Sequence, residues 1–218
     1  MTLRQTTLAV LVSLTYLFLV RLVATLLPVT TQSLLFTRLN AFLSLLAALM
    51  PVAFFIRFLR DIAQGESARL QLVTWGAIIS SILIALLFLK GPVTAFQWPI
   101  LSGFFQSSIF NAGGPVFVWI SATILWIFFI SLRQEPTVVS IPMLWNACWL
   151  ASLGAGIGVA LRTFLLFVFL TKGDLRWISD LPSGVQRAMV PLEGVSFLSF
   201  VYFYIVFYKS NLKSKMAR

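Results

Sequence analysis

An arginine in an otherwise uncharged apolar segment is the first residue of this sequence whose chemistry needs an explanation. Arg162 is the only charged residue between Val138 and Leu170. A guanidinium group in the hydrocarbon of a membrane costs free energy unless it meets an anion, another polar group or water. We therefore expect Arg162 to be compensated, and carboxylates and phosphates are the groups that match a guanidinium best.

A second arginine and one glutamate extend this pattern. Arg21 lies six residues before Leu27, and Arg162 lies eight residues before Leu170. With a rise of about 1.5 Å per helical residue, both arginines would lie roughly 9 to 12 Å below the same membrane boundary. We predict that Arg21 and Arg162 line an outward-opening polar cavity, in which Glu193 is the internal counter-ion.

If Glu193 satisfies only one arginine, the other would hold an anionic lipid headgroup, a carboxylate ligand or an acidic residue of a partner. The alternative is that both arginines extend to the outer headgroups or form buried ion pairs that fix the helices. Membrane lipids, including anionic ones, and further membrane protein subunits are therefore the expected partners.

Small residues precede Arg162 at helical spacing. Gly154, Gly158 and Arg162 are four residues apart and share one side of a helix. The predicted packing surface comprises Ala147, Ala151, Gly154, Ala155 and Gly158. Such residues let membrane helices approach closely, so this face is predicted to pack against another helix. The glycines do not follow a strand, which argues against a nucleotide-binding loop.

The residue types that most membrane enzymes need are missing from the sequence. The chain has no histidine and one cysteine, Cys148, which excludes histidine-ligated metals and haem as well as a disulfide framework. None of the six acidic residues falls in the middle of a predicted span. We expect no catalytic residue, no metal and no cofactor. A lipid-modifying reaction that uses Glu193, Asp180 and arginines is the remaining enzymatic alternative.

The elements that position these residues are membrane-spanning helices. Of the 218 residues, 60% are hydrophobic and only 10% are charged, and the uncharged runs approach or exceed the roughly 18 residues that cross a bilayer. Because lipid cannot satisfy backbone groups, such runs must be helical. We predict an all-α polytopic membrane helix bundle that forms a single domain over residues 1–218. Its six spans are expected at about 7–27, 34–59, 72–89, 115–132, 145–170 and 194–208.

Proline and glycine set the expected limits of these spans. The sequence from Asn111 to Pro115 is expected to break the chain before the fourth span. The connection from Gly91 to Pro115 is rich in aromatic residues, which predicts an interfacial or a re-entrant segment. The connection from Thr171 to Pro191 is predicted to contain a short surface helix over residues 183–189.

The positive charges predict the orientation. If both termini lie on one side, that side has nine Lys or Arg residues and the other has five. The nine are Arg4, Arg57, Arg60, Arg69, Arg133, Lys209, Lys213, Lys215 and Arg218, and the five are Arg38, Lys90, Lys172, Arg176 and Arg187. Positive residues favour the cytoplasmic side, so both termini are predicted to be cytoplasmic. The net charge of +10 then indicates anionic lipids rather than nucleic acid.

Three functional interpretations fit these features. The sequence favours a non-catalytic integral membrane protein that is a structural or assembly subunit of a larger membrane complex. One alternative is a small transport or ligand- and lipid-binding protein with an outward-facing, arginine-lined cavity. The other is the membrane sensing domain of a receptor. The expected location is the bacterial inner membrane or an equivalent energy-transducing membrane.

Overall fold

The computed structural model describes residues 2–26, 34–96, 103, 108–172 and 183–210. Within these ranges it leaves the side chains of residues 21, 23–26, 34–36, 108–112, 169, 172 and 183–190 undescribed. Six long helices make up nearly all of the described chain: α1 (Leu3–Leu26), α2 (Leu34–Asp61), α3 (Ala68–Ala95), α5 (Ser108–Gln134), α7 (Pro142–Lys172) and α8 (Ser183–Lys209). Two short helices, η2 (Ala63–Gly65) and α6 (Pro136–Val139), lie in the connections.

The predicted all-α bundle is confirmed. Each of the six long helices contains a segment that is long and apolar enough to cross a membrane. Their outward-facing side chains are apolar as well, for example Leu72, Phe167 and Leu170, which are 64–74% exposed. Apolar groups on the outside of a bundle suit a lipid surrounding, so the chain has the features of a multi-pass membrane protein.

Two predicted boundaries are wrong because helices continue through proline. Asn111–Pro115 lies inside α5 rather than before it, and residues 183–189 are the first turns of α8, which continues through Pro191. In lipid, an interrupted helix would expose unsatisfied backbone groups, so helices that contain proline are tolerated. The connection expected from Gly91 to Pro115 is shorter than predicted, because its two ends belong to α3 and α5. Its middle, residues 97–102 and 104–107, lies outside the described residues.

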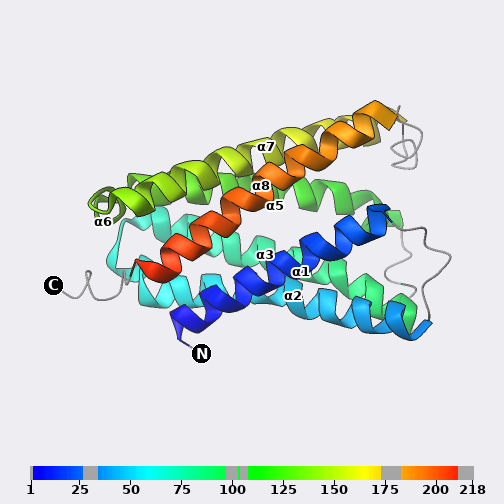
Figure 1. Cartoon of the computed structure of the whole chain (residues 1–218), viewed down its shortest axis with the longest axis horizontal. Helices are drawn as coiled ribbons and strands as arrows, with labels where there is room; N and C mark the ends of the chain where they lie inside the picture. The colour runs from blue at the N-terminus through cyan, green and yellow to red at the C-terminus, as the bar shows by residue number, and fades with distance from the viewer. Residues whose placement is uncertain (1, 27–33, 97–102, 104–107, 173–182, 211–218) are drawn as a thin grey trace.

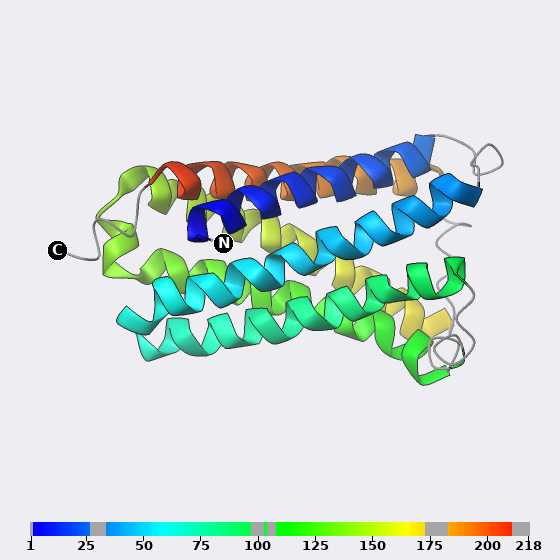
Figure 2. The ribbon, with the colours of Figure 1, turned by 90° about the horizontal axis from the view of Figure 1, so that it is seen from below.

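The six helices form a closed ring. Each long helix packs against the long helix before it and the one after it in the chain, and α1 packs against α8 to complete the ring. Short connections make consecutive helices antiparallel. The start of α1 and the end of α8 therefore lie at one end of the ring, which we call the terminal end (Figures 1 and 2).

An aromatic cluster fills the terminal end of the ring. It comprises Phe54, Phe55 and Phe58 of α2, Phe128 and Phe129 of α5, and Phe203, Tyr204 and Phe207 of α8. These side chains are at most 5% exposed, and the ring centroids of contacting members are 4.9–5.9 Å apart, mostly edge to face. Edge-to-face pairs are the favoured aromatic arrangement. The cluster connects three helices that are not neighbours in the ring.

Polar contacts join two connections at the same end. Ser67 donates a hydrogen bond to the Glu135 carboxylate, and Thr137 donates one to Glu66 Oε1 over 3.0 Å. Ser67 also accepts from the Leu70 amide and so caps the first turn of α3. The α2–α3 connection is thereby tied to the α5–α6 connection, and we call this the loop contact.

Candidate functional site

A cavity lies inside the helix ring and has two adjoining chambers. The inner chamber has a volume of about 300 Å³ and the outer chamber about 430 Å³. Leu14, Leu17, Phe88 and Phe200 are among the residues that line both. Because the two chambers share these walls, they adjoin, and their linings together extend along the axis of the ring.

The aromatic cluster forms the floor of the inner chamber. Phe55, Phe129 and Tyr204 belong to the cluster and also line this chamber. The outer chamber is lined instead by residues farther from the terminal end, such as Phe18 of α1 and Phe197 of α8. These two rings stack with their centroids 4.2 Å apart, so the α1–α8 contact that closes the ring is also a wall of the cavity.

Arg162 lines both chambers. Its side chain is half-buried, and Nη1 donates a hydrogen bond to the Gly158 carbonyl one turn earlier on α7, over 3.2 Å. The guanidinium group has five N–H donors in a planar fork. Arg162 therefore brings a permanent positive charge to a cavity whose other walls are mostly apolar.

Glu193 lines the outer chamber together with Arg162. The structure thus brings two of the three predicted site residues to one cavity. The third, Arg21, is in helix α1, but its side chain lies outside the described residues. Two opposite charges around one cavity create a field across it, and the low polarity of the surrounding walls strengthens that field.

The small residues of α7 make room for both the cavity and a close helix contact. A Cβ atom on Gly154 would overlap Ser199 Oγ and lie 3.2 Å from the Ser196 carbonyl oxygen of α8. Ser196 Oγ also donates a hydrogen bond to the Gly154 carbonyl over 2.8 Å. The other glycine, Gly158, lines both chambers. The three alanines of this face, Ala147, Ala151 and Ala155, are buried in the core.

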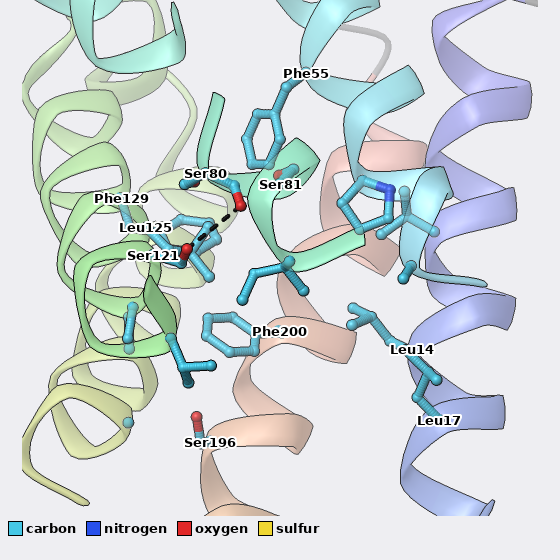
Figure 3. Close-up of a pocket in the computed structure, with 18 of the residues that line it drawn as sticks. Leu14, Leu17, Phe55, Ser80, Ser81, Ser121, Leu125, Phe129, Ser196 and Phe200 are labelled. Carbon is cyan, nitrogen blue, oxygen red and sulfur yellow. Dashed lines mark hydrogen bonds between the residues drawn. The ribbon is translucent and has the colours of Figure 1, made fainter. Parts of the chain in front are cut away.

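Four serines line the inner chamber, one of them Ser196 of α8, and none was predicted from the sequence as a site residue. Ser80 and Ser81 of α3 and Ser121 of α5 line it beside Phe55, Leu125 and Phe129 (Figure 3). Ser121 Oγ donates a hydrogen bond to the Ser80 carbonyl over 3.3 Å, and Ser80 Oγ donates one to the Ala77 carbonyl over 3.1 Å. Serine is common in membrane helices, so only the Ser80–Ser81 pair offered any signal in the sequence.

The acidic residues of the loop contact lie away from the cavity. Burial raises the pKa of Glu66, the hydrogen bond from Thr137 partly offsets this, and the nearby Glu135 carboxylate raises it further. Glu135 itself is only 6% exposed. Among the described residues, no three His, Cys, Asp or Glu side chains come together as a metal site would require. The loop contact therefore ties two connections together and lies apart from the candidate site.

Comparisons with known proteins leave the cavity as the main guide to function. No protein-family model matches the chain, and neither curated proteins nor solved structures give a match. Function is consequently inferred from the shape, charge and hydrogen-bonding groups of the cavity.

Proposed function

We propose that this protein is a non-enzymatic membrane protein that binds an amphipathic anionic molecule inside its helix ring. The observation that carries the proposal is the position of Arg162, which faces both chambers of a mostly apolar cavity. Small-molecule sites are typically concave spaces of about 300–1,000 Å³ with apolar walls and a few polar groups that fix orientation. The two chambers have this character.

The chemistry of the walls favours an amphipathic ligand. A carboxylate or phosphate can accept two parallel hydrogen bonds from one guanidinium, and a charge-assisted pair of this kind is stronger than a neutral hydrogen bond. The apolar part of the ligand would lie against Leu14, Leu17 and Phe200. Removing that part from water contributes about 25 cal/mol for each Å² of apolar surface.

Glu193 tunes the same site. Its carboxylate lines the outer chamber with Arg162 and, when ionised, repels an anionic ligand. A ligand carboxylate must therefore reach Arg162 against this repulsion, or carry a cationic group that Glu193 attracts. The pair of charges selects both the charge of the ligand and its orientation.

Binding has more specific support than the role of complex subunit that the sequence favoured. That role was favoured by missing catalytic groups, small size and abundant aromatic surface, which many membrane proteins share. A cavity with a charged residue facing its interior is a feature that a purely structural subunit does not need. Transport and sensing would both use this same binding step.

The test is binding of radiolabelled decanoate to the protein in lipid nanodiscs. We expect saturable binding that weakens about 10- to 100-fold in Arg162→Met, since hydrogen bonds to a charged group contribute about 1.5–3 kcal/mol. Arg60→Met removes an exposed arginine at the end of α2 and is the matched control, with unchanged affinity. Equal binding to the protein and to Arg162→Met, with both variants folded, would show that the cavity is not an anion site.

A further inference from the structure

Two hydroxyl groups of the inner chamber, those of Ser80 and Ser121, have a defined hydrogen-bonding direction. Ser121 Oγ is bonded to the Ser80 carbonyl and Ser80 Oγ to the Ala77 carbonyl. A backbone carbonyl can only accept, so the single proton of each hydroxyl is committed to that bond. The hydroxyl oxygens keep their lone pairs, and both therefore present acceptors.

These acceptors lie in an apolar part of the cavity. Ser80 is 5% exposed and Ser121 is 9% exposed, and Figure 3 shows them between Phe55 and Phe129. Ser196 lines both chambers, and its hydroxyl also donates a hydrogen bond to a backbone carbonyl, that of Gly154. Arg162 thus supplies hydrogen-bond donors to the cavity, whereas these three serines supply acceptors.

The donors and the inner acceptors are separated along the ring axis. Ala155 lines the inner chamber and lies seven residues before Arg162 on α7, which corresponds to about 10 Å of helix. On α8, the lining residues extend from Glu193 to Tyr204, eleven residues or roughly 16 Å. A ligand held at Arg162 by one end can therefore place its other end at Ser80 and Ser121.

We infer that the ligand carries a hydrogen-bond donor, a hydroxyl or N–H group, at the end opposite its anionic group, and that Ser80 and Ser121 recognise this donor. The inference rests on the proposed function, because it assumes that Arg162 holds the anionic end. The substrate class is thus a bifunctional amphiphile: an anion, an apolar spacer of about 10 Å, and a terminal donor. An acceptor-only terminus, such as an ether oxygen, meets like lone pairs at this position.

The experiment compares three probes that differ only at the far end. Decanoate ends in a methyl group, ω-hydroxydecanoate ends in a donor, and ω-methoxydecanoate has the ether oxygen without the proton. In nanodiscs, we expect the protein to bind ω-hydroxydecanoate about three- to tenfold more tightly than either of the others, the size of one neutral hydrogen bond.

Variants assign the preference to the serines. In Ser80→Ala/Ser121→Ala, the preference for ω-hydroxydecanoate should disappear, while the affinity for decanoate stays within about twofold of the original, since neither serine holds the carboxylate. Ser140→Ala removes an exposed hydroxyl that donates to Thr137 outside the cavity, and should keep the preference. Ser121→Ala alone provides the same comparison if the double variant is unstable.

The outcomes separate this inference from the proposed function. If all three probes bind the protein equally in a manner that depends on Arg162, the anion site stands and the terminal donor site is wrong. If the double variant still prefers ω-hydroxydecanoate, Ser80 and Ser121 do not bind the donor group and the inference is wrong. If no probe binds in a manner that depends on Arg162, the proposed function itself fails.

Discussion

Gly154 lies at the close contact between α7 and α8, next to the cavity. It lets α7 approach α8 closely enough for Ser196 to bond across the interface, and the next residue one turn along, Gly158, borders the cavity. In membranes, where lipid is as apolar as the side chains, such close packing and interhelical hydrogen bonds drive helix association. A single methyl group at Gly154 would therefore affect both the interface and the wall of the cavity.

Gly154→Ala should destabilise the protein by about 1–3 kcal/mol, the usual cost of overpacking a tight contact. The added Cβ would overlap Ser199 Oγ, and the Ser196 backbone prevents a simple shift. Thermal unfolding in detergent provides the measurement. Gly194→Ala on α8 is the matched control, because an added Cβ there meets nothing within 4 Å, and it should leave the midpoint unchanged or slightly raised. Equal midpoints for the two variants would contradict the close-contact role of Gly154.

Charge was easier to interpret from the sequence than hydroxyl groups were. A charged residue in a membrane span stands out, so Arg162 and Glu193 were singled out, and both line the cavity. The role of Ser80 and Ser121 depends on which carbonyl takes each proton and on which helices face each other. Neither is encoded by spacing along one helix.

At the scale of elements, the loop contact joins two connections whose carboxylates, Glu66 and Glu135, repel each other when both are ionised. The pKa of Glu66 lies above its ordinary value of 4.5 because of burial, and the nearby Glu135 carboxylate adds to this despite the Thr137 hydrogen bond. A raised pKa in the folded state means that the folded protein holds the proton more tightly. The resulting stability is fully present below about pH 4.5 and is lost as the pH rises through the raised value.

Glu66→Gln should therefore be more stable than the original protein at neutral pH, and the difference should vanish as the pH falls toward 4.5, the ordinary pKa. Glutamine still offers an oxygen to Thr137 but cannot ionise. Unfolding midpoints measured from just below the ordinary pKa of 4.5 up to neutral pH give the comparison. Glu135→Gln removes the neighbouring charge and should shrink the pH-dependent difference. A pH-independent difference between the original protein and Glu66→Gln would rule out this linkage.

The elements themselves were largely predictable, and their limits were not. Length and hydropathy identify all six spans, because the bilayer demands long helices. The sequence Asn111–Pro115 suggests a break by the standards of soluble proteins, yet α5 runs through it. The reason is that an unwound backbone surrounded by lipid would lack hydrogen-bond partners, so a continuous helix is favoured.

At the scale of the whole molecule, the ring depends on a contact between its first and last helices. Phe18 of α1 stacks on Phe197 of α8, and the Arg4 guanidinium lies 4.4 Å from the centre of the Tyr208 ring. One contact lies beside the outer chamber and the other at the terminal end. No periodicity in the sequence predicts which helices meet, so the ring could not be derived before the structure, although the charges of Arg162 and Glu193 had suggested a cavity.

The orientation of the ring is a separate prediction from charge. The terminal end should face the cytoplasm, because the described positive residues there are Arg4, Arg57, Arg60, Arg69, Arg133 and Lys209. In a Cys148→Ala background, Ser210→Cys should react with a membrane-impermeant maleimide only after permeabilisation, whereas Thr171→Cys, at the opposite end of α7, should react in intact cells or spheroplasts. The reverse pattern would invert the orientation and place the outer chamber on the cytoplasmic side.

The aromatic cluster closes the cavity at the terminal end of the ring. Because interlocked rings from α2, α5 and α8 block the terminal end, the cavity is a blind pocket on that side. A molecule that binds in the inferred orientation enters from the opposite end with its donor end first, and this end passes Arg162 and Glu193 before it reaches Ser80 and Ser121. Passage through the ring would require separating buried aromatic pairs, each worth about 0.5–1.5 kcal/mol beyond its buried area. Under the proposed function, a ligand therefore enters and leaves the cavity on the same side of the aromatic cluster.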